Sequence, residues 1–192
     1  MPSDARVLLL KSARNEIEQY GVLDFRISRV ATAANCSITQ IYRYFGSRNG
    51  IVAQALADLY QEILERSIDA VEQHVKNFDT MTIENVLAMF TDPKERAAMP
   101  MMPVRLQILA VASTIPELEE KISEITQHLY VKWVQLIEEV RERLPKDVIL
   151  DERAITIDLL LMMPYYAYLM GGLAVSVENY VAWVRHKLFP GQ

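Results

Sequence analysis

Apolar residues recur every three or four positions along most of this chain, and that spacing limits the possible folds more than any other feature. Leu9, Ala13, Ile17 and Tyr20 form one such series, and Gly21 follows it where a helix would end. No stretch alternates apolar and polar residues cleanly enough for a half-buried strand. We therefore predict an all-α protein of about nine helices.

Caps, glycines and prolines indicate where these helices begin and end. Two short helices are expected at about 27–34 and 37–45, joined by a turn in which Asn35 tolerates a left-handed backbone. Ser37 can cap the second of them with its hydroxyl. Further helices are expected at about 47–75, 82–90, 104–113, 116–144, 151–177 and 178–188.

The short helix from Ser37 has one apolar side when it is drawn at about 100° per residue. Ile38, Ile41 and Phe45 fall together there, and we expect all three to pack inward, because so short a helix is not stable alone. Cys36, in the preceding turn, is expected to be a small buried hydrophobe. The helix is therefore predicted to be firmly seated on its neighbours.

The opposite side of this helix carries side chains that suit the edges of DNA bases. Gln40 can pair with adenine, Arg43 with guanine, and Thr39 offers a hydroxyl and a methyl group. Neighbouring side chains would hold phosphates, which fix position without reading sequence. The predicted DNA-binding residues are Arg26, Ser28, Ser37, Thr39, Gln40, Tyr42, Arg43, Tyr44 and Arg48.

The charge of the chain is unevenly distributed in a way that agrees with this prediction. The whole chain has a formal net charge of −5. Residues 1–50 nevertheless carry a net charge of +3, whereas residues 51–192 carry −8. A polyanion such as DNA would be attracted to the first segment and repelled by the second.

The segment from about Leu9 to Ile51 resembles the DNA-binding domain of the TetR family of bacterial regulators. The resemblance covers about a quarter of the chain and lies in Tyr20-Gly21, in Val30-Ala31 and above all in the run SITQIYRYF from Ser37. It implies a three-helix, helix-turn-helix domain that binds duplex DNA.

The segment also departs from that family at several positions. The family usually has paired threonines where Phe25 and Arg26 stand, so the cap of the helix that follows must differ. It usually has glycine at the position of Asn35, a small residue at that of Thr39 and lysine at that of Arg48. The base preference of relatives therefore cannot be copied to this chain.

The resemblance also implies that the C-terminal helices form a ligand chamber and a two-fold dimer interface. Two strongly apolar C-terminal helices agree with it, because such helices need a partner surface. Methionine and aromatic side chains suit apolar guests, although core packing is the alternative for each of them. The predicted ligand-binding residues are Met89, Phe90, Met102, Trp133, Met162, Tyr165, Tyr166 and Tyr168.

These inferences combine into one expected function. Residues 1–50 are predicted to be the helix-turn-helix domain, and residues 51–192 a helical domain for ligand binding and dimerisation. The chain would be a homodimeric transcriptional repressor that leaves its DNA operator when a small apolar or amphipathic effector binds. One alternative is a DNA-binding regulator with no small-molecule ligand. Another is a membrane-anchored regulator, because residues 159–177 contain no charge.

No enzymatic activity, cofactor or metal site is expected. The three histidines are far apart, and the sequence has no Cys-x-x-Cys pair and no glycine-rich phosphate loop. The single cysteine, Cys36, and the lack of a long apolar run near the first residues favour a cytoplasmic location over a secreted one.

Overall fold

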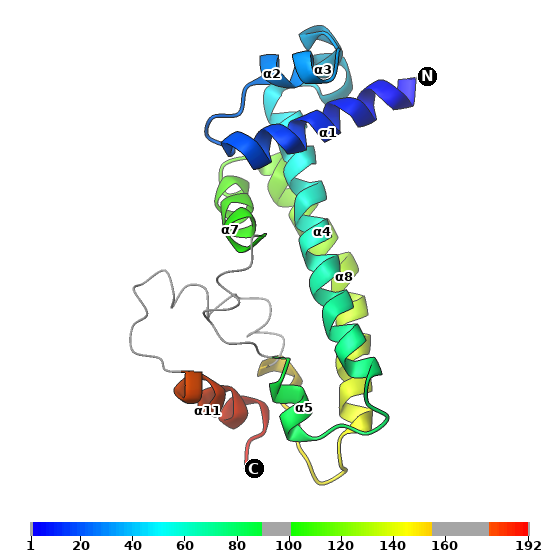
Figure 1. Cartoon of the computed structure of the whole chain (residues 1–192), viewed down its shortest axis with the longest axis vertical. Helices are drawn as coiled ribbons and strands as arrows, with labels where there is room; N and C mark the ends of the chain where they lie inside the picture. The colour runs from blue at the N-terminus through cyan, green and yellow to red at the C-terminus, as the bar shows by residue number, and fades with distance from the viewer. Residues whose placement is uncertain (1, 90–100, 155–176, 192) are drawn as a thin grey trace. The chain divides into compact units, whose positions relative to one another are not determined.

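The computed structural model of the chain, shown in Figure 1, describes residues 2–89, 101–154 and 177–191. Within these ranges every regular element is helical, which confirms the all-α class. The helices are α1 (Pro2–Tyr20), α2 (Ile27–Ala33), α3 (Ile38–Phe45), α4 (Arg48–Lys76), α5 (Ile83–Leu87), α7 (Met101–Ala112), α8 (Pro116–Arg143) and α11 (Val177–Leu188).

The ends of these helices lie close to the predicted ones, with one informative difference. Helix α7 was expected to start after Pro103, but it starts at Met101, so Pro103 lies in the first helical turn. Proline is tolerated there because the amide that it lacks has no acceptor within the helix. The helix expected at 151–177 falls mostly outside the described residues.

The chain packs as two units, each with its own buried residues. The first contains residues 1–65 and 103–129, and the second contains residues 66–102 and 130–192. Helices α4 and α8 each contribute to both units. The sequence predicts a boundary at residue 50 between a DNA-binding part and a part for ligand binding and dimerisation. That boundary separates two expected functions, not two packing units, and it stays a prediction.

In the first unit, α1, α2 and α3 contact one another (Figure 1), and their buried side chains form a small apolar core. Helix α4 adds apolar residues that recur every four positions, and these four, Ile51, Ala55, Leu59 and Ile63, are all buried. The buried apolar residues that α1, α2 and α3 contribute to this core are Leu9, Ala13, Ile17, Val30, Ala31 and Ile41. Tyr20, which was placed on the inner face of α1, is instead substantially exposed.

The turn between α2 and α3 has the backbone that the sequence predicts. Asn35 has a φ of 51°, the left-handed conformation that the turn requires of it. Cys36 is half-buried, so the expectation that it packs fully inside was wrong. Ser37 caps α3 by accepting a hydrogen bond from the backbone amide of Gln40 at 3.2 Å.

The junction between α3 and α4 depends on a glycine. A Cβ atom placed on Gly50, in the first turn of α4, would lie 1.9 Å from the carbonyl oxygen of Phe45, the last residue of α3. Any other residue at this position would force the two helices apart. The absence of a side chain at Gly50 thus permits the close approach of α3 and α4.

In the second unit, an arginine caps the C-terminal end of α4. The Arg143 guanidinium donates hydrogen bonds to the carbonyl oxygens of Val75 at 2.6 Å and Phe78 at 2.9 Å. Val75 lies in the last turn of α4, where its carbonyl also accepts the amide of Phe78 at 3.2 Å, and Phe78 lies two residues beyond the helix. Arg141, two residues earlier on α8, is instead exposed and pairs with Glu152.

Among the helices of the described ranges, none combines the length and the apolar character that crossing a membrane would demand. The uncharged run at 159–177 lies outside those ranges.

Candidate nucleic-acid interface

Helix α3 is held in place by one fully buried side chain. Ile41 has no exposed surface, and Phe45, one turn later, is half-buried. Ile38 was expected to join them, but 39% of its surface is exposed. The first residue of α3 therefore lies at the edge of its buried side, with part of the side chain facing outward.

The outward face of α3 presents a compact set of side chains. Thr39 and Arg43 are exposed as predicted, and Tyr42 is 47% exposed. The Arg43 guanidinium donates a hydrogen bond of 2.9 Å to the hydroxyl of Tyr44 and lies 4.8 Å from the centre of that ring. This contact fixes the direction of a cation on the exposed face of α3.

Gln40 lies on the flank of α3 rather than at the centre of its outer face. Its Oε1 atom accepts hydrogen bonds from the backbone amide of Ser37 at 2.7 Å and from the Ser37 hydroxyl at 3.2 Å. Together with the bond from the Gln40 amide to the serine, these form a capping box. The sequence carried the signal for this arrangement, a serine followed three residues later by glutamine, but periodicity alone assigned Gln40 to DNA.

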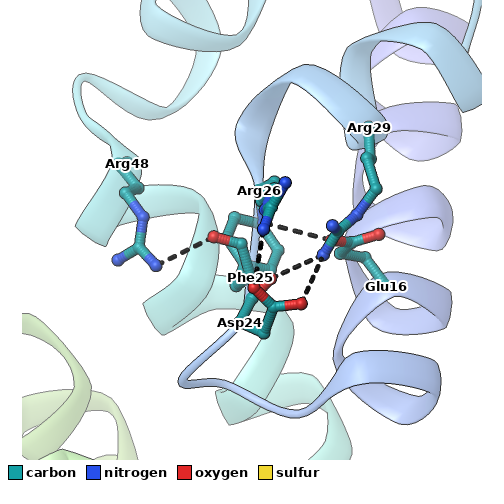
Figure 2. A network of polar contacts seen from close by, with 6 residues as sticks. All are labelled: Glu16, Asp24, Phe25, Arg26, Arg29 and Arg48. Atoms are coloured by element: carbon teal, nitrogen blue, oxygen red, sulfur yellow. Dashed lines mark hydrogen bonds and ion pairs between the residues drawn. The ribbon is translucent and has the colours of Figure 1, made fainter.

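Helix α2, which precedes α3, has its N-terminal end held by a buried carboxylate of α1. Arg26 occupies the cap position of α2, and its side chain makes no capping hydrogen bond. Glu16, of which only 6% is exposed, accepts a hydrogen bond of 3.1 Å from the Arg26 amide and one of 2.6 Å from Nε of Arg29 (Figure 2). Glu16 thereby serves α2 in place of the threonine pair that this chain lacks.

Arg29 connects Glu16 to the loop between α1 and α2. Its guanidinium also donates a hydrogen bond of 2.5 Å to the carbonyl oxygen of Asp24 (Figure 2). It lies 4.1 Å from the centre of the Tyr20 ring, which explains why that ring stays at the surface. The hydrogen bond with Glu16 raises the pKa of the Arg29 guanidinium above its usual value.

The remaining predicted DNA-binding residues surround α3. The Arg26 side chain is exposed and lies 3.3 Å from a carboxylate oxygen of Asp24. Arg48, at the start of α4, donates a hydrogen bond of 3.1 Å to the carbonyl oxygen of Phe25 (Figure 2). Ser28 is exposed on α2. The structure thus brings the whole predicted set into one three-helix region.

The predicted ligand-binding set is described only in part. Met89 and Trp133 are both buried, in a hydrophobic cluster of the second unit that also contains Leu136, Tyr180 and Val184. The side chains of Phe90, Met102, Met162, Tyr165, Tyr166 and Tyr168 lie outside the described residues.

Comparisons with known proteins agree with this arrangement. Residues 9–55 match the family model of bacterial regulatory proteins, tetR family. No curated protein sequence matches the chain.

Three solved structures have a similar fold over nearly the whole chain. The fatty acid degradation regulator FadR from Bacillus halodurans has 20% identity and a TM-score of 0.55, over 97% of this chain and 99% of that one. A protein from Mesorhizobium loti assigned to the TetR family of transcriptional regulators has 13% identity and a TM-score of 0.61, over 97% and 94%. The superantigen PfiT has 13% identity and a TM-score of 0.60, over 100% of each chain. At these identities the likenesses establish the fold alone.

Proposed function

We propose, on the premise that this chain is a DNA-binding transcriptional regulator of the tetR family, that it works as a homodimeric repressor controlled by a small molecule. Each copy inserts α3 into the major groove of an operator. An apolar or amphipathic effector binds the C-terminal helices and lowers the affinity for DNA.

The observation that carries the DNA-binding part of the proposal is the exposed face of α3. Thr39, Tyr42 and Arg43 project from a helix that Ile41 anchors in the core. A recognition helix needs this combination, because its base contacts are precise only if the helix itself is fixed. Arg26 and Arg48 supply positive charge beside it for phosphates.

Exposed apolar side chains of the second unit support a homodimer. Trp183 on α11 is 44% exposed, and Tyr130, Val131 and Val134 form an exposed apolar strip on α8. Large aromatic residues at a surface are typical of protein interfaces, and a second copy of the chain is the commonest partner. Two recognition helices held by such a dimer would reach half-sites about 34–36 Å apart.

The effector class rests on composition and on one structural neighbour. Methionine and tyrosine side chains beyond residue 85 suit an apolar or amphipathic guest. The similar structure from Bacillus halodurans is that of a fatty acid degradation regulator, which favours fatty acids as the first compounds to test.

A second candidate function is a regulator that binds DNA without any small molecule. The burial of Met89 and Trp133 inside a hydrophobic cluster favours it, because side chains that fill a core leave no room for a guest there. The ligand experiment below distinguishes the two candidates.

The DNA-binding part is tested by selecting binding sites from a pool of random duplexes. We expect an enriched palindrome that binds two chains, with an affinity that falls steeply as the salt concentration rises. Arg43→Ala should weaken binding to it about 10- to 100-fold, which is the size of a lost bidentate base contact. Arg141→Ala, which removes an exposed arginine of the second unit, is the matched control and should bind like the wild type. If Arg43→Ala also binds like the wild type, α3 is not the reading element.

The effector part is tested by melting the protein with octanoate, palmitate and a library of hydrophobic drugs. A ligand selective for the native state should raise the melting temperature, and the same compound should release the selected duplex in an anisotropy titration. Arg43→Ala should show an unchanged thermal shift, because the ligand site is separate from the DNA face. A library in which no compound both raises the melting temperature and weakens DNA binding would favour the ligand-free regulator.

A further inference from the structure

We propose that Ile38 reads DNA sequence, by packing its side chain against the 5-methyl group of a thymine in the major groove. The proposal rests on the proposed operator binding and adds a specific base to it. Its starting point is an apolar side chain found exposed where periodicity had placed it in the core.

The position of Ile38 on α3 is that of a base-contacting residue. It is the first residue of the helix, and the N-terminal residues of a recognition helix are the ones that meet base edges. Tyr42 lies one turn further along the same face, four residues away, and Thr39 lies beside it. Ile38 therefore belongs to the same outward surface as the polar residues that would read DNA.

The chemistry of the side chain selects the thymine methyl group. Isoleucine can neither donate nor accept a hydrogen bond, and every other distinguishing group in the major groove is a hydrogen-bond donor or acceptor. The methyl group of thymine is the one apolar feature there. Contact with it would also remove the exposed surface of Ile38 from water, which favours the complex.

The restraint on Gln40 strengthens this assignment. A bidentate contact to adenine needs both the oxygen and the nitrogen of the glutamine amide. In the structure that oxygen accepts the backbone amide of Ser37 at 2.7 Å, so reading adenine would require breaking the cap of α3. The face left to read bases consists of Ile38, Thr39, Tyr42 and Arg43.

The test removes only the methyl group. The palindrome selected by the wild-type protein is resynthesised with each thymine in turn replaced by deoxyuridine, symmetrically in both half-sites. One replacement should weaken wild-type binding about fourfold for each half-site, the effect of one buried methyl group. Ile38→Ala should bind the original duplex more weakly and should not distinguish it from that deoxyuridine duplex. Ile38→Val, which keeps a branched apolar side chain, should keep the discrimination.

A matched variant separates Ile38 from its neighbour, because the threonine methyl group could make the same contact. Thr39→Ser removes that methyl group and should leave the discrimination between thymine and deoxyuridine intact. Discrimination that survives in Ile38→Ala but disappears in Thr39→Ser overturns the proposal. So does a wild-type protein that binds every deoxyuridine duplex equally well. A pool without any enriched duplex contradicts the proposed function itself and the Ile38 contact with it.

Discussion

Replacing Glu16 with alanine should lower the melting temperature of the protein by several degrees and weaken its binding to DNA. The carboxylate is buried and accepts hydrogen bonds from the amide of Arg26 and the guanidinium of Arg29. A donor left without its partner costs about 1–3 kcal/mol, which corresponds to about 2–4 °C per kcal/mol in a chain of this size. Since α2 starts at this contact, its loss also loosens the support of α3. Circular dichroism melting and an anisotropy titration measure the two effects.

Two variants show whether the carboxylate itself is responsible. Glu18→Ala removes an exposed glutamate from the same helix and should melt like the wild type. Glu16→Gln keeps an oxygen that can accept the Arg26 amide but loses the charge that faces Arg29, so it should fall between the wild type and Glu16→Ala. Equal melting temperatures for Glu16→Ala and Glu18→Ala would show that the contact does not support α2.

Ile41→Ala should produce the largest loss of stability of any substitution in α3. Ile41 is the one residue of this helix with no exposed surface, and truncating such a side chain costs about 2–5 kcal/mol. The helix is too short to persist without its anchor, so operator binding should be lost as well. Hydrogen exchange of the α3 amides, with thermal melting of the whole chain, measures the effect.

The control for this prediction is the same change at an exposed site on the same helix. Ile38→Ala should leave the melting temperature and the amide protection of α3 close to those of the wild type, because Ile38 contributes little to the core. A larger loss of stability in Ile38→Ala than in Ile41→Ala would mean that the side of α3 that carries Ile38, and not the side that carries Ile41, packs against the core.

Much of the fold could be predicted because its signals are local. Ser37 and Asn35 define the turn before α3, and the four-residue spacing on α4 marks its buried face. The burial of Ile38 was predicted wrongly, and the part of Gln40 in the cap of α3 was missed, because counting apolar residues takes no account of the Ser37–Gln40 capping box. That signal was local too, because a serine followed three residues later by glutamine is the sequence pattern of a capping box.

Contacts over long separations could not be predicted. Glu16 reaches Arg29 across 13 positions, and Arg143 reaches Val75 across 68. In a sequence, each of these charged residues looks like part of a solvated helix face. Only the packing of helices against one another shows which charged side chains form hydrogen bonds at the end of a neighbouring helix and which face water.

The contact at Gly50 has a mechanical consequence for any signal that passes along α4. A hinge between α3 and α4 would absorb a small rotation of the longer helix before it reached the DNA. The carbonyl oxygen of Phe45 lies so close to Gly50 that not even a Cβ atom would fit between them, so the two helices are in close contact at this junction. A tilt of the first turns of α4 would therefore be passed on to α3, and if two copies of the chain bind one operator as proposed, the spacing between their α3 helices would change with it.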